Sequence, residues 1–388
     1  MRASPRRLPV TPDHEDMPLD LAIASAIAGE RALDFERDVL AVFAYQFDHN
    51  LPYRNYCERR GRTPATVEHW RDIPAVSTAA FKIVDLACAP PERVFRTSGT
   101  TRGPDGRGCH PVPRLAVYKT AALRHFTACV ACEGRRGPVL ALTPPPALRP
   151  DSSLVQMIEW IREAYGTGTS EYFVGPAGLD AGTLSARLAA MEREGEPGYL
   201  IGLTAAFERL FAHCGAGQRR FRLPYGTLVI DTGGHKGAAA AGAGHPLSPA
   251  GFIAACWRFL GVPGYHCINE YGMTELCSQF YDNVLHERVA GRLTPRCKIG
   301  PPWTRTLVVD PETLTEVAPG RPGLLRHYDL ANCGSVLAVQ TDDVGVRLET
   351  GFVLQGRVAG AEPRGCALLL EDIVEANASS LPPSSRSA

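Results

Sequence analysis

A loop rich in glycine and hydroxyl side chains is the first segment whose residue types suggest chemistry. It runs from 95 to 108 and contains Ser98-Gly99-Thr100-Thr101. Glycines allow tight turns that present backbone N–H groups, and hydroxyls add further donors, so such a loop suits phosphate oxygens. It is not a Walker A loop, because G-x-x-x-x-G-K-[ST] is absent and no lysine lies nearby. Taken alone, this composition is more common in ordinary surface loops.

A second segment, Asn269-Glu-Tyr-Gly-Met-Thr-Glu275, comes at the end of a predicted buried strand. Ligands of open α/β sheets bind at the carboxyl ends of the strands. There Tyr271 could stack on a base, Thr274 could bind a phosphate, and Glu275 could hold Mg²⁺ through its hard oxygens. Taken by itself, the segment is better explained by a core tyrosine and a surface glutamate.

The elements that would position these segments alternate along the chain, which predicts an α/β fold with a parallel sheet covered on both faces. Helical spacing predicts one or two helices in 20–50, then helices at 115–132, 153–165, 181–193, 205–214 and 249–260. Apolar runs predict buried strands at 137–142, 171–174, 199–202, 227–230 and 266–269. After 306 we expect no helices but a more antiparallel, β-rich end with strands at 307–309, 324–327, 335–339 and 352–354.

Composition excludes several classes of function. The chain has 388 residues, 41 basic and 41 acidic side chains, and therefore no basic surplus for nucleic acid or anionic membranes. Its longest apolar stretch near the N-terminus is too short to cross a bilayer, and its start is unlike a signal peptide, so we expect a cytoplasmic protein. The twelve cysteines form no dense disulfide framework. Cys129 and Cys132 form a C-x-x-C with no second ligand pair, which argues against zinc.

The combination of motifs is more specific than any one of them. S-G-T-T, Y-G-M-T-E, the T-D-D of 341–343 and Gly356-Arg357 follow in an order that resembles the adenylate-forming superfamily. More narrowly, the chain resembles the acyl-protein synthetases, the fatty-acid-activating ligases of the bacterial bioluminescence type. This narrower resemblance covers roughly 50–372 and rests on the segments 70–74, 81–82, 231–237, 269–282 and 360–366.

The resemblance implies a site for ATP and Mg²⁺. It assigns phosphate binding to the loop residues Ser98, Gly99, Thr100 and Thr101. It also places the glycine pair Gly233 and Gly234 in the ATP site. It places Tyr271 on the adenine with Asn269 near its amino edge, Thr274 on the α-phosphate and Glu275 on the Mg²⁺. Asp343 matches the aspartate that binds the ribose hydroxyls, and Arg357 matches the arginine before the usual hinge. These donors and the Mg²⁺ would neutralise the phosphate charge and align a substrate carboxylate with the α-phosphate of ATP, so that the carboxylate can attack the phosphorus.

The chain departs from the superfamily pattern after Arg357. Members usually continue into a mobile small domain with a catalytic lysine, whereas here 31 residues follow Arg357 and no lysine follows Lys298. We therefore expect disordered ends at 1–19 and 376–388, a large domain at 20–355 with N-terminal helices at 20–60, and a rudimentary C-terminal segment at 356–375. Lys236 is the candidate substitute cation, with a lysine on a surface turn as the alternative.

Cys366 is the candidate acyl acceptor, because a thiolate is a strong nucleophile near neutral pH and the resembled family transfers its acyl group to a cysteine near the C-terminus. Arg364 could help to ionise it. The alternative is a small buried residue at the start of a strand-like run, 367–370. His110, His235 and His266 are candidate bases or acyl-pocket residues, or else structural histidines. Cys256, Cys267, Cys277 and Cys297 are expected to be core residues.

The resemblance implies that a carboxylic acid, with a fatty acid favoured, reacts with ATP to give acyl-AMP. A thiol, Cys366 above all, then captures the acyl group for delivery to a partner such as a reductase, transferase or carrier protein. One alternative is an aryl- or acyl-CoA ligase resembling the phenylacetate-CoA ligases. Another is a catalytically silent nucleotide-binding subunit.

Overall fold

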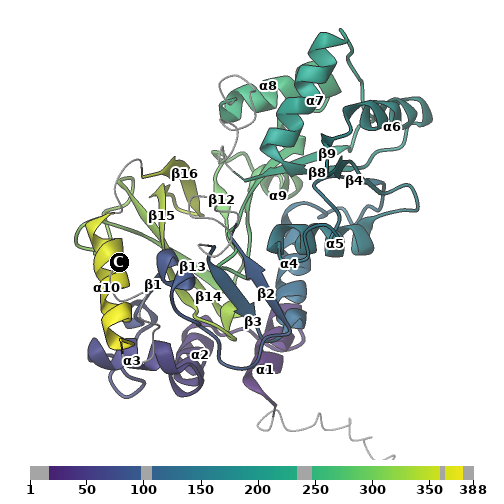
Figure 1. Cartoon of the computed structure of the whole chain (residues 1–388). Helices are drawn as coiled ribbons and strands as arrows, with labels where there is room; N and C mark the ends of the chain where they lie inside the picture. The colour runs from purple at the N-terminus through teal and green to yellow at the C-terminus, as the bar shows by residue number, and fades with distance from the viewer. Residues whose placement is uncertain (1–16, 98–106, 234–246, 359–362, 379–388) are drawn as a thin grey trace, which may run out of the picture.

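The computed structural model describes residues 17–97, 107–233, 247–358 and 363–378 (Figure 1). The helices within these ranges are α1 (Leu19–Ala28), α2 (Phe35–His49), α3 (Leu51–Arg59), α4 (Leu115–Cys129), α5 (Ser153–Tyr165), α6 (Ala181–Glu194), α7 (Thr204–Ala216), α8 (Pro249–Leu260), α9 (Val284–Val289) and α10 (Arg364–Ala376). Short 3₁₀ turns include η3 (Thr78–Lys82) and η7 (Leu330–Asn332). None of the helices in the described ranges is long and apolar enough to span a bilayer.

A 12-stranded sheet forms the centre of the molecule. Its parallel part has the order β10-β9-β8-β4-β5. Those strands are β4 (Val139–Leu142), β5 (Glu171–Tyr172), β8 (Tyr199–Leu203), β9 (Leu228–Thr232) and β10 (Cys267–Tyr271). The strands are parallel because the helix between consecutive strands returns the chain to the edge at which the next strand starts.

An antiparallel part continues the same sheet beyond β10. Its order is β13-β14-β15-β16-β12-β11, with β11 joined to β10 and with β1 added in parallel to β15. These strands are β1 (Val76–Ser77), β11 (Phe280–Asp282), β12 (Lys298–Ile299), β13 (Thr304–Val309), β14 (Pro322–Asp329), β15 (Ala338–Arg347) and β16 (Phe352–Arg357). Two small hairpins lie apart from the sheet: β2 (Arg93–Arg96) with β3 (Cys109–Val112), and β6 (Val174–Gly175) with β7 (Gly178–Leu179).

Helices cover both faces of the parallel part, because adjacent residues of its strands are buried on opposite faces of the sheet. Ile201 on β8 packs in a core with residues of α4 and α5, whereas the adjacent Leu200 packs with residues of α6, α7 and α8. Successive side chains of a strand point to opposite faces, so a strand buried on both faces is apolar throughout. Figure 1 shows the two helical layers on either side of these strands.

The predicted α/β class and most element positions are confirmed. α5 and α8 have the predicted bounds, and the segment after 306 is largely antiparallel β structure. The prediction that helices stop after 306 was wrong. The run 367–370, interpreted as strand-like, lies inside α10, where Cys366, Leu369 and Ile373 recur at helical spacing and are buried against the sheet.

Candidate functional site

The candidate site lies at the carboxyl ends of β9 and β10, where two of the predicted motifs begin. Asp231 on β9 lies opposite Asn269 on β10, and Thr232 lies opposite Glu270. Gly233 follows with a φ of +73°, in the left-handed region that favours glycine. The remaining predicted loop residues lie outside the described residues: Ser98, Gly99, Thr100, Thr101, Gly234, His235 and Lys236.

Tyr271, Asp343 and Arg357, which the sequence proposed separately, are brought together by strand pairing. The Tyr271 hydroxyl donates to Asp343 Oδ2 (2.9 Å), and Arg357 Nε donates to Asp343 Oδ1 (3.1 Å). Asp343 on β15 lies directly opposite Arg357 on β16. The three side chains therefore form one polar group beside the end of β10, with the carboxylate held by two donors.

The Tyr271 ring is more enclosed than its predicted stacking role suggests. It is 6% exposed, and the rings of Phe280, His327 and Phe352 lie 5.7–5.8 Å from its centroid. Burial, followed by the charge of Asp343, raises the pKa of its hydroxyl well above the usual value, so this hydroxyl remains a donor at neutral pH. Adenine stacking on Tyr271 stays a prediction.

The backbone of Thr274 and Glu275 is anchored by two residues from distant elements. His110 Nδ1, on β3, lies 2.6 Å from the carbonyl oxygen of Thr274, and the Asn332 amide donates to the carbonyl of Glu275 (2.8 Å). Asn332 also accepts from the backbone N–H of Cys277 (2.7 Å). Burial lowers the pKa of His110 to about 4, so its ring is neutral at pH 7 and acts here as a hydrogen-bonding support. No motif in the sequence had pointed to Asn332.

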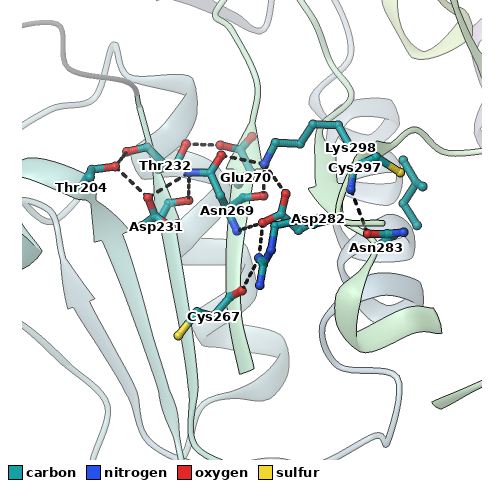
Figure 2. A network of polar contacts seen from close by, with 12 residues as sticks. Thr204, Asp231, Thr232, Cys267, Asn269, Glu270, Asp282, Asn283, Cys297 and Lys298 are labelled. Atoms are coloured by element: carbon teal, nitrogen blue, oxygen red, sulfur yellow. Dashed lines mark hydrogen bonds and ion pairs between the residues drawn. The ribbon is translucent and has the colours of Figure 1, made fainter. Parts of the chain in front are cut away.

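A buried polar network fixes Asn269, as Figure 2 shows. Lys298 Nζ donates to the carbonyl of Asn269 and to its Oδ1 (both 2.6 Å), and to Asp282 Oδ1 (2.8 Å). The Asn269 amide in turn donates to Asp231 Oδ2 (2.9 Å). Asp282 Oδ2 accepts from Arg296 (2.6 Å). Both polar atoms of the Asn269 side chain are therefore bonded, one to Asp231 on β9 and the other to Lys298 on β12. Its position near adenine stays a prediction.

Cys366 lies in the first turn of α10 and is completely buried. Its Sγ lies 3.8 Å from the carbonyl oxygen of Thr341, two residues before Asp343 on β15. Arg364, predicted to help ionise the thiol, is exposed at the start of the helix. The structure therefore places Cys366 next to the strand that carries Asp343 but covers it with its own helix. Both interpretations of this cysteine, acceptor and core residue, remain compatible with that position.

The other candidate residues that the structure describes are buried. His266 is buried beside Tyr225 and Tyr265, and the four cysteines expected in the core are buried. Cys129 contacts the ring of His125 (3.6 Å). In the ranges that the structure describes, no three His, Cys, Asp or Glu side chains gather as a metal cage.

The donor set fits Mg²⁺ bound together with substrate phosphates. Mg²⁺ is commonly held by one or two carboxylates plus phosphate oxygens and water, and seldom by a cage made only of protein groups. Glu275 is 9% exposed, its backbone carbonyl accepts from Asn332, and its side chain is a carboxylate of the kind that such a site uses.

Sequence comparison with known proteins gives a local match. No protein-family model matches the chain. The long-chain-fatty-acid–luciferin-component ligase of Aliivibrio fischeri is 31% identical over 86 residues, which is 20% of this chain and 23% of that protein. The chain thus matches less than a quarter of the length of this curated relative.

Solved structures match over most of the chain. 2-Hydroxyisobutyryl-CoA ligase in an open conformation, in complex with 2-HIB-AMP and CoA, superposes with a TM-score of 0.58 at 16% identity, covering 84% of this chain and 70% of that one. The same ligase in its thioesterification state gives a TM-score of 0.58 at 16% identity, covering 91% and 74%. The chain therefore has the α/β fold of the adenylate-forming enzymes.

Proposed function

We propose that this protein activates a carboxylic acid with ATP and passes the acyl group to a thiol. In the first step a carboxylate oxygen attacks the α-phosphorus, an O–P bond forms, and pyrophosphate leaves. In the second step the thiol sulfur attacks the acyl carbon, AMP leaves, and the thiol loses its proton to solvent. The observation that carries the proposal is the grouping of Tyr271, Asp343 and Arg357 beside the segment with Thr274 and Glu275.

The proposed roles are those that the resemblance to the adenylate-forming superfamily implies, and the chemistry of the side chains suits them. Asp343 accepts hydrogen bonds from the ribose hydroxyls, for which Tyr271 and Arg357 orient its carboxylate. Thr274 contacts the α-phosphate, and Glu275 holds Mg²⁺, which neutralises phosphate charge when bound. The glycine- and hydroxyl-rich loop at 98–101 and the glycine pair at 233–234 bind the phosphates, and Lys236 supplies a cation to the carboxylate and α-phosphate.

We propose a fatty acid as the acid and Cys366 as the first acyl acceptor. The local match to a long-chain-fatty-acid ligase supports the acid, and the position of Cys366 beside β15 supports the acceptor. Because the thiol is covered by α10, the helix has to move before the acyl group can be transferred. A protein such as a reductase, transferase or carrier protein would then receive the acyl group.

A second candidate is a CoA ligase, which the complete burial of Cys366 favours. An external thiol needs no movement of α10. The two candidates differ in the product: a stable protein thioester requires Cys366, whereas acyl-CoA formation does not.

ATP–pyrophosphate exchange across a panel of short to long fatty acids, with benzoic and phenylacetic acids beside them, tests the proposal. We expect exchange with fatty acids, and Asp343→Asn should weaken ATP binding about 10- to 100-fold, since a hydrogen bond to a charged group is worth about 1.5–3 kcal/mol. Glu349→Gln, at the exposed turn between β15 and β16, is the matched control and should behave as wild type. No exchange with any acid would contradict the proposed function.

A further inference from the structure

Three polar side chains form a row on one face of the sheet at the carboxyl edge. Glu270 on β10 lies opposite Thr232 on β9 and opposite Tyr281 on β11. Alternation places Glu270 on the opposite face of β10 from Asn269. The row faces α4 and α5, since Ile230 and Ile268, two residues before Thr232 and Glu270, pack in the core that contains those helices.

The carboxyl group of Glu270 extends toward the end of its strand. The Thr232 hydroxyl donates to Glu270 Oε2 (Figure 2). A Cβ atom built on Gly272 would lie 2.4 Å from Glu270 Oε1, so this glycine makes room for the carboxyl group. The group therefore lies where β10 passes into the 272–275 segment, at the edge of the sheet at which α/β proteins bind ligands.

The surroundings of Glu270 oppose its charge. The residue is 5% exposed, and burial raises its pKa to about 7 although the Thr232 hydroxyl and the ammonium of Lys298 on β12 favour the ionised form. The carboxyl group of Asp231 on β9 opposes ionisation. Tyr118 on α4 and Tyr281 on β11 complete its surroundings, and burial raises the pKa of both hydroxyls, so they stay neutral.

We propose that Glu270 is a substrate-binding residue that, in its protonated form, donates a hydrogen bond to the carboxylate of the acid and holds it near Thr274. The inference rests on the proposed function. A protonated carboxyl group can donate to an anion, whereas an ionised one repels it. An acid whose oxygen must reach the α-phosphate held at Thr274 has to approach this edge of the sheet. Binding the acid therefore requires that Glu270 hold its proton.

The pH dependence of the KM for the acid tests this role. It is measured by ATP–pyrophosphate exchange at saturating Mg-ATP, with the acid of the panel that gives the fastest exchange. Fatty acids stay ionised from pH 6 to 8, so the wild-type KM should rise about tenfold over that range if only the protonated form binds. Glu270→Gln keeps an N–H donor that does not titrate, and its KM should change less than about twofold.

Two further variants separate binding from a structural role. Thr232→Val removes a bond that favours the ionised form, so the rise in KM should move to higher pH. Glu287→Gln on α9 removes another buried carboxylate, paired with Arg292, and should keep the wild-type pH dependence. If Glu270 only holds Thr232 in place, Glu270→Gln and Thr232→Val should alter stability but leave the pH profile of KM unchanged.

The outcomes are distinct. A wild-type KM that is flat from pH 6 to 8, or a pH dependence that persists in Glu270→Gln, would overturn the inference and leave adenylation intact. If Glu270→Gln does not fold, as circular dichroism would show, the shift expected in Thr232→Val decides the question. Absence of exchange in the wild type with every acid would instead refute the proposed function, and the inference with it.

Discussion

Cys366 should react with thiol reagents only when α10 leaves the body of the protein. The helix buries Cys366, Leu369 and Ile373 completely or nearly so, and it packs on α3, β1 and β15. Beside its contact with α3 it carries Asp372 and Glu375, which pair with Arg60, directly after α3, and with Arg59, the last residue of α3. Opening therefore exposes an apolar face and breaks exposed ion pairs.

The magnitudes identify the apolar face as the dominant restraint. Leu369→Ala should cost about 2–5 kcal/mol of docking free energy, as large-to-small changes in cores do. That corresponds to a labelling rate of Cys366 about 30- to 4,000-fold higher, at about 1.4 kcal/mol per tenfold change. Glu375→Gln, which removes the exposed partner of Arg59, should change the rate at most about fivefold, since such pairs contribute about 0.2–1 kcal/mol.

Labelling with iodoacetamide, followed by peptide mass spectrometry, measures the rate at each cysteine separately. Cys277 serves as an internal reference, because it is buried beside η7, away from α10, and reports global unfolding. In wild type Cys366 should react far more slowly than a free thiol. Rapid labelling of Cys366 in wild type, or equal effects of Leu369→Ala and Glu375→Gln, would refute the reasoning that apolar docking of α10 protects the thiol.

Two further predictions concern stability. Burial lowers the pKa of His125 from 6.5 to about 4, so between these pH values the unfolded chain binds more protons than the folded protein. The free energy of unfolding therefore falls with falling pH, by up to about 1.4 kcal/mol per pH unit. Denaturant titrations of His125→Gln at several pH values should show a dependence on pH that is smaller by this amount, and an unchanged dependence would contradict the prediction. Lys298→Met leaves Asn269 and Asp282 without their buried cation and should lower the free energy of unfolding, measured by urea titration, by about 3–5 kcal/mol. A loss below about 1 kcal/mol would show that Arg296 alone is enough to balance the charge of Asp282.

Local sequence pattern was enough to predict the helices and strands whose conformation depends mainly on residues close by in the chain. The helix α5 has Ser152 as its N-cap and apolar residues at helical spacing, and its predicted bounds agree with the structure. Strands buried on both faces, such as β8, are apolar throughout and were found for that reason. α10 was missed because its short apolar run, 367–370, fits a strand as well as a helix until the packing of its face is known.

The sequence by itself determined the class of fold, the order of the motifs and the residue types of the proposed phosphate, ribose and metal sites. Only the tertiary structure decided which of them meet. Tyr271 reaches Asp343 across 72 residues through the pairing of β10, β15 and β16 with the rest of the sheet, and Lys298 enters the network around Asn269 in the same way. It also decided that Cys366 is covered. Hydrogen-bond partners and burial depend on strand order and packing, which local spacing along the chain does not specify.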